Sequence, residues 1–145
     1  QRQMCIRDSC NGDLGIFDTT TNTISLGEPI PYYMEMTTIS ATLYNDKIYV
    51  IGARPPSPML YTFYIYDIAS NTWTEGSNMQ NAKVGSSITV HDGKIYAAGG
   101  FEFGYDDPSY IIDDIQAYDI QKDVWETVGS VQNGEIEKRR HHRPR

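Results

Sequence analysis

Two segments of this chain, about 50 residues apart, are nearly the same. Tyr66–Trp73 (YDIASNTW) returns as Tyr118–Trp125 (YDIQKDVW), and Phe17–Ile24 (FDTTTNTI) is a weaker copy that has Ile in place of Trp. Self-similarity at this period indicates a repeat architecture, in which each unit buries its apolar faces only by stacking on its neighbours. With two complete copies and one partial copy, the chain resembles a segment of a larger array.

A second motif repeats in step with the first. Lys47–Gly52 (KIYVIG) returns as Lys94–Gly100 (KIYAAGG), and each copy follows a tight-turn signal, Asn45-Asp46 or Asp92-Gly93. The pattern predicts four-stranded antiparallel meanders and almost no helix, because Gly, Pro and Asn interrupt every helical period. The predicted strands are 40–44, 47–51, 61–68 and one opened by Trp73, then 87–90, 94–98, 112–120 and one opened by Trp125.

The repeat divides the chain into five parts. Residues 37–83 and 84–131 are each expected to form one four-stranded unit, and 10–36 a partial unit with a linker. Residues 1–9 have no repeat counterpart and resemble translated sequencing-adaptor read-through, so we expect a non-native or disordered leader. Residues 132–145 are expected to be a disordered basic tail or the start of a further unit. The two cysteines, Cys5 and Cys10, do not indicate a compartment, and the localisation stays open.

Charge is unevenly distributed along the chain. The segment 138–145 carries five of the 12 Lys and Arg residues and none of the 19 Asp and Glu residues, so the rest is strongly acidic. An acidic body argues against nucleic acid as a partner, because phosphate binding needs a basic face. No apolar run approaches the roughly 18 residues that span a membrane, so no membrane contact is expected either.

The repeated residues suit packing and turn formation. Tyr66, Trp73, Tyr118 and Trp125 offer large flat surfaces to bury between stacked sheets. The Asp of each copy (Asp18, Asp67, Asp119) can accept hydrogen bonds from backbone N–H groups of the following turn. Gly99 and Gly100, with Gly52 at the first of these positions in the earlier copy, are expected where the backbone has positive φ or passes close to a neighbour.

A strand that ends in Gly-Gly, followed by Tyr-Asp and by Trp six residues later, resembles the Kelch repeat of β-propellers. The resemblance covers residues 14–128 and extends to the lead-in Met79–Ser86, where Lys83 stands for the usual Arg and Ser86 for the usual His. It implies an all-β fold of consecutive four-stranded blades, here an incomplete propeller, since closure needs roughly 4 to 8 blades. The tail also has Arg139 and His142 at the lead-in spacing.

The sequence offers no catalytic, metal or cofactor site. His91 lies beside a tight turn, and no nucleophile and base can be assembled around it. Glu102, Asp106-Asp107 and Asp113-Asp114 could bind Ca²⁺ through oxygen atoms, but their spacing matches no calcium loop, which favours a solvated acidic loop.

Family resemblance implies that the loops entering each blade, and those between its second and third strands, form a rim that holds a protein partner. Here these loops are 53–60 and 101–110. The expected partner-binding residues are Arg54, Lys83, Ser86, Phe101, Phe103, Tyr105 and Tyr110, with Tyr33 and Glu35 near the same end. Aromatic residues beside charges suit an interface, although the same aromatics could instead fold the loop onto its own blade.

The sequence therefore predicts a non-catalytic Kelch-repeat scaffold that binds a protein. The alternative is a fragment of a propeller-containing carbohydrate-active or oxidase enzyme whose catalytic residues lie elsewhere. Two and a half blades would leave strand edges and apolar faces unpaired, so we also expect the isolated chain to self-associate.

Overall fold

The computed structural model describes residues 2–6, 14–31, 39–54, 60–81, 85–102 and 110–131, and all regular structure in these ranges is β. No helix in the described ranges is long and apolar enough to cross a membrane. The strands are β1 (Arg2–Ile6), β2 (Leu14–Asp18), β3 (Thr23–Gly27), β4 (Ile39–Tyr44), β5 (Lys47–Arg54), β6 (Leu60–Asp67), β7 (Thr72–Glu75), β8 (Ser87–His91), β9 (Lys94–Ala98), β10 (Phe101–Glu102), β11 (Tyr110–Ile111), β12 (Asp114–Asp119) and β13 (Val124–Ser130).

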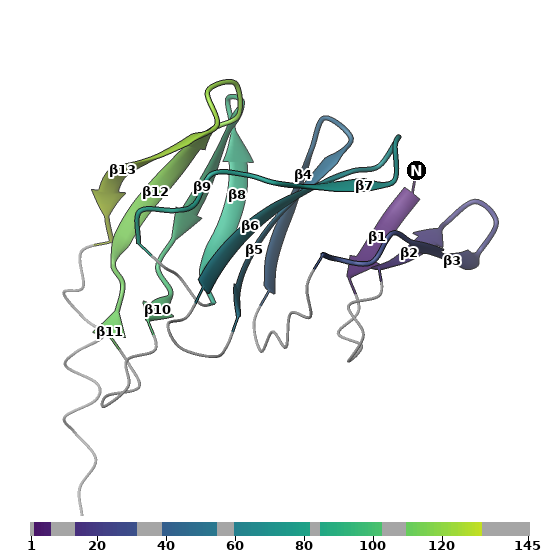
Figure 1. Ribbon diagram of the computed structural model, residues 1–145, viewed down its shortest axis with the longest axis horizontal. Helices are drawn as coiled ribbons and strands as arrows, with labels where there is room; N and C mark the ends of the chain where they lie inside the picture. Colours follow the sequence, from purple (N-terminus) through teal and green to yellow (C-terminus); the bar gives the residue numbers. More distant parts are fainter. Residues whose placement is uncertain are drawn as a thin grey trace, which may run out of the picture.

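The strands form three consecutive antiparallel sheets and one short ribbon (Figure 1). We call β1–β3 blade 1, β4–β7 blade 2, and the sheet of β8, β9, β12 and β13 blade 3. Blades 2 and 3 are four-stranded meanders in which each strand pairs with the next one in the sheet. The predicted all-β architecture of consecutive four-stranded blades is therefore confirmed.

Blade 1 differs from the expectation at its first strand. The backbone of Arg2–Ile6 pairs antiparallel with β2, from Arg2 opposite Asp18 to Ile6 opposite Leu14. Residues 1–9 were expected to be a non-native or disordered leader, and these five residues form a strand in the structure. An uncovered strand offers unpaired N–H and C=O groups to any extended segment, which explains how residues without a repeat counterpart join the sheet. Their non-native origin stays a prediction.

The tight turns are set by residues with positive φ. Asn45 and Asp46 have φ of 48° and 56°, and Asp92 and Gly93 have 46° and 70°. Positive φ at both central residues defines the type I′ turn, whose twist matches that of the flanking strands. The first hairpins of blades 2 and 3 thus both have the tight turn that their sequences predict.

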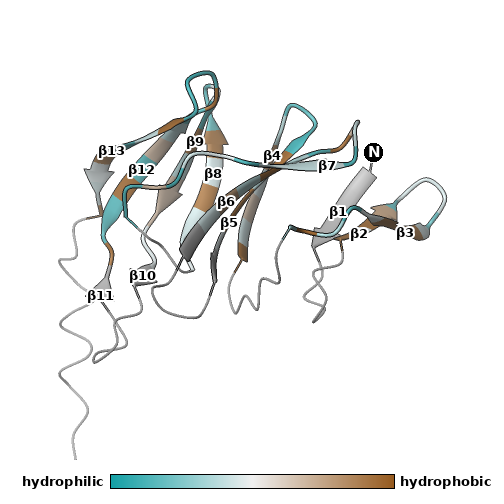
Figure 2. Cartoon of the chain, viewed as in Figure 1, coloured by the Kyte–Doolittle hydropathy of each residue, from teal (hydrophilic) through white to brown (hydrophobic). Residues whose placement is uncertain are grey.

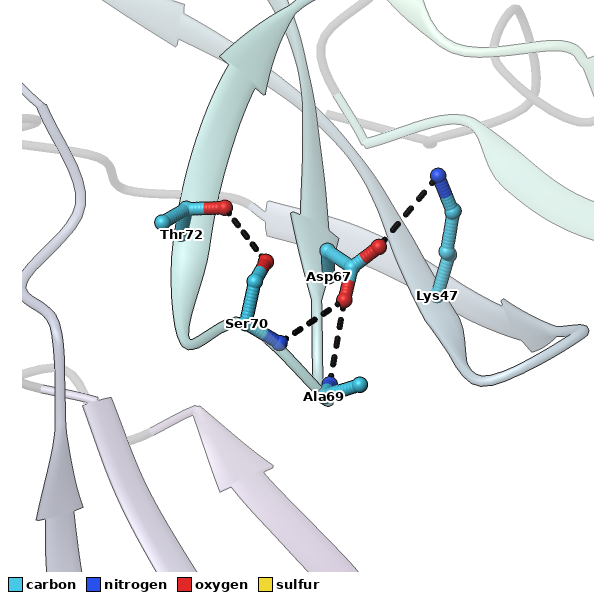
Figure 3. Close-up of polar contacts among 5 residues, drawn as sticks. All are labelled: Lys47, Asp67, Ala69, Ser70 and Thr72. Carbon is cyan, nitrogen blue, oxygen red and sulfur yellow. Dashed lines mark hydrogen bonds and ion pairs between the residues drawn. The ribbon is translucent and has the colours of Figure 1, made fainter.

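The Asp of each repeat closes the turn between the third and fourth strands. In blade 2, one carboxylate oxygen of Asp67 accepts from the backbone N–H groups of Ala69 and Ser70, each at 3.0 Å, and the other lies 3.4 Å from the Lys47 ammonium (Figure 3). The N–H of Ser70 holds the pKa of Asp67 below its usual value, against partial burial that raises it, and Lys47 lowers it further. Asp18 and Asp119 accept equivalent bonds from their own turns.

Apolar side chains gather between the blades. Figure 2 places hydrophobic residues along the strands and hydrophilic ones in the turns that join β4 to β5 and β12 to β13. Between blades 2 and 3, Phe63 packs edge-on against Tyr118 and Trp125, with ring centroids 4.6 and 5.1 Å apart. The buried residues of this core are Tyr49, Ile51, Phe63, Ile95, Ala97, Tyr118 and Trp125. Between blades 1 and 2 the buried residues are Leu14, Ile48, Val50 and Tyr66.

A polar clamp accompanies the apolar core between blades 1 and 2. Asn71, which has φ of 56°, accepts through Oδ1 from the backbone N–H of Glu28 at 2.8 Å and from the Tyr66 hydroxyl at 2.5 Å. The Trp73 indole N–H donates to the carbonyl oxygen of the same Glu28 at 2.8 Å. Both backbone groups of one residue leaving blade 1 are therefore held by blade 2.

The same clamp joins blades 2 and 3. Asp123 accepts from the backbone N–H of Ser77 at 2.9 Å and from the Tyr118 hydroxyl at 2.7 Å, and the Trp125 indole donates to the Ser77 carbonyl at 2.9 Å. The Ser77 N–H, and then the Tyr118 hydroxyl, lower the pKa of Asp123. Burial raises the pKa of Tyr118, and its bond to Asp123 adds to that effect. The two Tyr-Asp to Trp segments thus occupy equivalent places.

A glycine at the end of the fourth strand makes room for the core. A Cβ added at Gly76 would lie 2.5 Å from the Phe63 ring, and one at Gly27 would lie 2.9 Å from the Tyr66 hydroxyl of blade 2. At Gly129, the equivalent position of blade 3, an added Cβ meets no atom within 4 Å. A side chain at Gly27 or Gly76 would therefore collide with an aromatic residue of the core, whereas Gly129 has open space beside it.

Gly76→Ala is expected to lower the free energy of unfolding by about 1–3 kcal/mol, because the buried Phe63 ring must move. Gly129→Ala is the matched control and should have little effect. Urea denaturation at low protein concentration, followed by tryptophan fluorescence, measures both. Equal destabilisation by the two substitutions would contradict this account of the glycine.

Asp123→Asn tests the charged member of the clamps. The folded-state pKa of Asp123 is lowered, so its contribution to stability is present above the unfolded value of about 3.9 and is lost as the pH falls through the lowered value. Asn keeps the acceptor oxygen, as Asn71 does in blade 2, but does not titrate. Between pH 5 and pH 2 the urea midpoint of Asp123→Asn should therefore fall less than that of the wild type. The difference corresponds to the stability that the ionised Asp123 carboxylate contributes in the wild type.

Asp123→Ala, which removes the acceptor, should be less stable than Asp123→Asn at neutral pH. Parallel acid profiles for the wild type and Asp123→Asn would show that Asp123 is not held as a carboxylate by these donors.

Candidate interaction surface

One end of the structure carries the strand ends that lead into the predicted rim loops. In Figure 1 the free ends of β5, β6, β10 and β11 lie at the lower end, and the tight turns β4–β5 and β12–β13 lie at the upper end. In blade 2, β5 and β6 stay paired as far as Arg54 opposite Leu60. The loop between them therefore starts from a complete two-stranded ladder.

Blade 3 presents its loop on a separate ribbon. Phe101 pairs with Ile111 and Glu102 with Tyr110, as a two-stranded sheet distinct from the blade. The base of the ribbon is fixed by backbone hydrogen bonds from Ile112 N–H to the Gly100 oxygen at 3.0 Å and from Gly99 N–H to the Asp114 oxygen at 3.4 Å.

The Gly-Gly pair separates the ribbon from the blade. Gly99 and Gly100 have φ of 65° and 106°, which L side chains rarely adopt, so the strand ends at Ala98 and resumes at Phe101. In blade 2 the pair is Gly52-Ala53, neither has positive φ, and β5 runs through both to Arg54. Where blade 3 has Gly100, blade 2 has Ala53, and its strand β5 continues past this position without a break.

Some predicted rim residues can be placed and others cannot. The backbones of Arg54, Phe101 and Tyr110 lie at the strand ends described above. Ser86 is buried, with 4% of its surface exposed, and its carbonyl oxygen accepts from the Ser40 hydroxyl of the neighbouring blade. Ser86 therefore lies below the surface where blades 2 and 3 meet. The remaining residues lie outside the described ranges: Tyr33, Glu35, Lys83, Phe103 and Tyr105.

The sequence reading missed a polar group that fixes the lead-in of blade 3. Gln116 is fully buried, accepts from the Gln80 N–H at 3.0 Å and donates to the Asn81 carbonyl oxygen at 3.2 Å. Asn81 also donates to Asp114 at 2.8 Å. The available signal was a glutamine on a third strand where blade 2 has Tyr64, a buried aromatic residue.

The histidine considered in the sequence analysis lies in an exposed turn. His91 lies 3.4 Å from Asp92 at a tight turn, with both side chains mostly exposed. Within the ranges that the structure covers, no three His, Cys, Asp or Glu side chains are arranged to hold a metal ion.

Comparison with known proteins identifies the repeat. Two family models described as Kelch motif match residues 36–80 and 82–132, which are blades 2 and 3 with their lead-ins. The chain is 30% identical to Kelch-like protein 23 of Homo sapiens over 124 residues, which are 84% of this chain and 21% of that protein. It is 31% identical to an F-box/kelch-repeat protein of Arabidopsis thaliana over 87 residues, 60% of this chain and 21% of the relative.

A solved structure has the same fold. The structure of YjhT superposes with a TM-score of 0.70 at 15% identity, and the match covers 85% of this chain and 46% of that one. The chain spans about a fifth of the curated relatives named above. The repeated motifs, the four-stranded blades and these matches all indicate the same family. The chain belongs to the Kelch-repeat family, and its blades form an incomplete β-propeller.

Proposed function

We propose that this chain is a non-catalytic interaction scaffold that binds a protein partner through the loops at one end of its blades. The observation that carries the proposal is the pair of ladders that end at Arg54–Leu60 and Glu102–Tyr110, on adjacent blades and at the same end (Figure 1). Loops carried on rigid strands are where binding residues are usually found. Kelch-like and F-box/kelch-repeat relatives support a scaffold role in general.

Loop composition supports a protein as the ligand. The segment 101–110 contains Phe101, Phe103, Tyr105 and Tyr110, and Arg54 lies at the base of the neighbouring loop. Aromatic residues and Arg are the usual anchors of protein interfaces. The enzyme alternative depends on residues outside this chain and stays a prediction.

The acidic residues of segment 101–110 indicate the charge of the partner's surface. The segment 101–110 carries three acidic residues, Glu102, Asp106 and Asp107, and no Lys or Arg. A partner surface with basic residues beside apolar ones would complement it and would be attracted at long range. Binding should therefore weaken as salt is raised.

The test is capture of partners from a lysate by the immobilised chain, followed by a titration with the purified partner. Combining Arg54→Ala with Phe103→Ala should weaken that partner's affinity about tenfold or more, because interface anchors each contribute more than about 1 kcal/mol. His91→Ala is the control and should bind like the wild type, because His91 lies in the exposed turn between β8 and β9, at the end of β9 away from Ala98. Unchanged binding by the double variant, or loss of binding by His91→Ala, would place the surface elsewhere.

A further inference from the structure

The chain that enters blade 3 runs along one face of the third strand of that blade. We call residues 77–81 the entry segment. The Gln80 N–H donates to the side-chain oxygen of Gln116 at 3.0 Å. The Asn81 side-chain amide donates to the Asp114 carboxylate at 2.8 Å. Asp114 and Gln116 are two positions apart on β12, so their side chains lie on the same face of the sheet. The entry segment therefore ends beside Asp114, where β12 begins.

Asp114 also fixes the base of the ribbon β10–β11. Its carboxylate accepts from Asn81, and from the Gln116 amide at 3.1 Å. Its backbone carbonyl oxygen accepts from the N–H of Gly99 at 3.4 Å. Gly99 is the first of the two glycines that turn the chain out of blade 3, and the ribbon continues from the lower ends of β9 and β12 in Figure 1. One residue is thus bonded through its side chain to the entry segment and through its backbone to the ribbon.

Gln116 completes the connection between the two segments. Its side-chain amide donates both to the Asn81 carbonyl oxygen at 3.2 Å and to the Asp114 carboxylate, while its oxygen accepts from Gln80. Gln116 is fully buried. A buried polar network with its hydrogen bonds made is rigid, and a residue without exposed surface cannot touch a partner. Any effect of Gln116 on binding must therefore act through the residues that it holds.

Blade 2 has neither member of the bond between Gln80 and Gln116. The repeat places Tyr64, a buried aromatic residue, where blade 3 has Gln116. Counted from the residue that the clamp holds in each blade, Pro31 stands where blade 3 has Gln80. Proline has no N–H to donate, so an amide at the position of Tyr64 would gain nothing there. The two positions differ together, and the hydrogen-bonded entry belongs to the blade whose loop stands on a separate ribbon.

We propose that Gln116 is a positioning residue of the binding surface, which holds the entry segment and the ribbon as one rigid unit. The inference rests on the proposed function, because the chain continues from the entry segment to Lys83 and from β10 to Phe103, two of the expected partner-binding residues. Two loops held on a common base are presented together before a partner arrives. Binding then loses less conformational entropy than it would if each segment were ordered separately.

Amide hydrogen exchange of the ¹⁵N-labelled chain tests the connection without a partner. Gln116→Leu removes the three bonds and adds no charge. The N–H groups at the ribbon base, Gly99 and Ile112, should then exchange about fivefold faster or more, since a hydrogen bond contributes about 1 kcal/mol. Amides of β5 in blade 2 report global unfolding and serve as the reference. Unchanged exchange at both ribbon-base amides would overturn the proposal.

A second variant covers the case in which Gln116→Leu does not fold. Asn81→Ala removes the bond from an exposed side chain to Asp114 and leaves the buried amide in place. It should also accelerate exchange at Gly99 and Ile112, by a smaller factor than Gln116→Leu. Wild-type exchange at these two amides in Asn81→Ala would equally overturn the proposal.

Thr127→Val is the matched control. The Thr127 hydroxyl donates to the Gln80 side-chain oxygen at 3.0 Å, so this change also removes a bond to the entry segment but does not touch Gln116 or Asp114. Exchange at the ribbon base should stay at the wild-type rate. Acceleration equal to that of Gln116→Leu would show that any loosening of the entry segment has this effect, and would overturn the assignment to Gln116.

The binding arm uses the purified partner from the capture experiment. Gln116→Leu should weaken its affinity about threefold or more, because the surface must be ordered on binding, and Thr127→Val should not. Wild-type affinity of Gln116→Leu, beside a weakened Arg54→Ala/Phe103→Ala double variant, would overturn the positioning role alone. Wild-type affinity of the double variant would instead contradict the proposed function, and the exchange results would stand without it.

Discussion

The clamp between successive blades is the interaction on which the rest of the structure depends. In each clamp, one residue that follows the last strand of a blade, Glu28 or Ser77, donates its N–H to an Asn or Asp side chain of the next blade. The carbonyl oxygen of the same residue accepts from a Trp indole of that next blade. These bonds fix where the connecting chain crosses, while the aromatic rings below them bury the apolar faces. Because a single blade has no second layer to cover it, stability and blade orientation come from this joint.

The joint also holds the strands that lead into the loops 53–60 and 101–110. It lies between rigid sheets, and the strands of those sheets continue without interruption toward Arg54 in blade 2. In blade 3 the positive φ values of Gly99 and Gly100 redirect the backbone into a separate ribbon. The two loops therefore start from different bases, a continuous hairpin in blade 2 and a separate two-stranded ribbon after blade 3.

The sequence predicted the parts of the fold that depend on local chemistry. Strand alternation, the two I′ turns and the Asp-closed turns all follow from residues close together in the chain, and all are present. It did not predict that Glu28 and Ser77 form the clamps, because they contribute backbone groups that no side chain marks. Nor did it predict the buried Gln116 network, whose partners come from a distant segment. The strand Arg2–Ile6 was missed because it has no repeat counterpart.

The most direct measurement of the central claim is hydrogen exchange at the two indole N–H groups, resolved by NMR of the ¹⁵N-labelled chain. Both indoles donate to a backbone carbonyl in equivalent clamps, so both should exchange much more slowly than a free indole. Trp125, which is buried, should be the slower of the two, because Trp73 is half-buried. Exchange at the free rate for both, or protection of one alone, would contradict the account that successive blades are joined by one repeated contact.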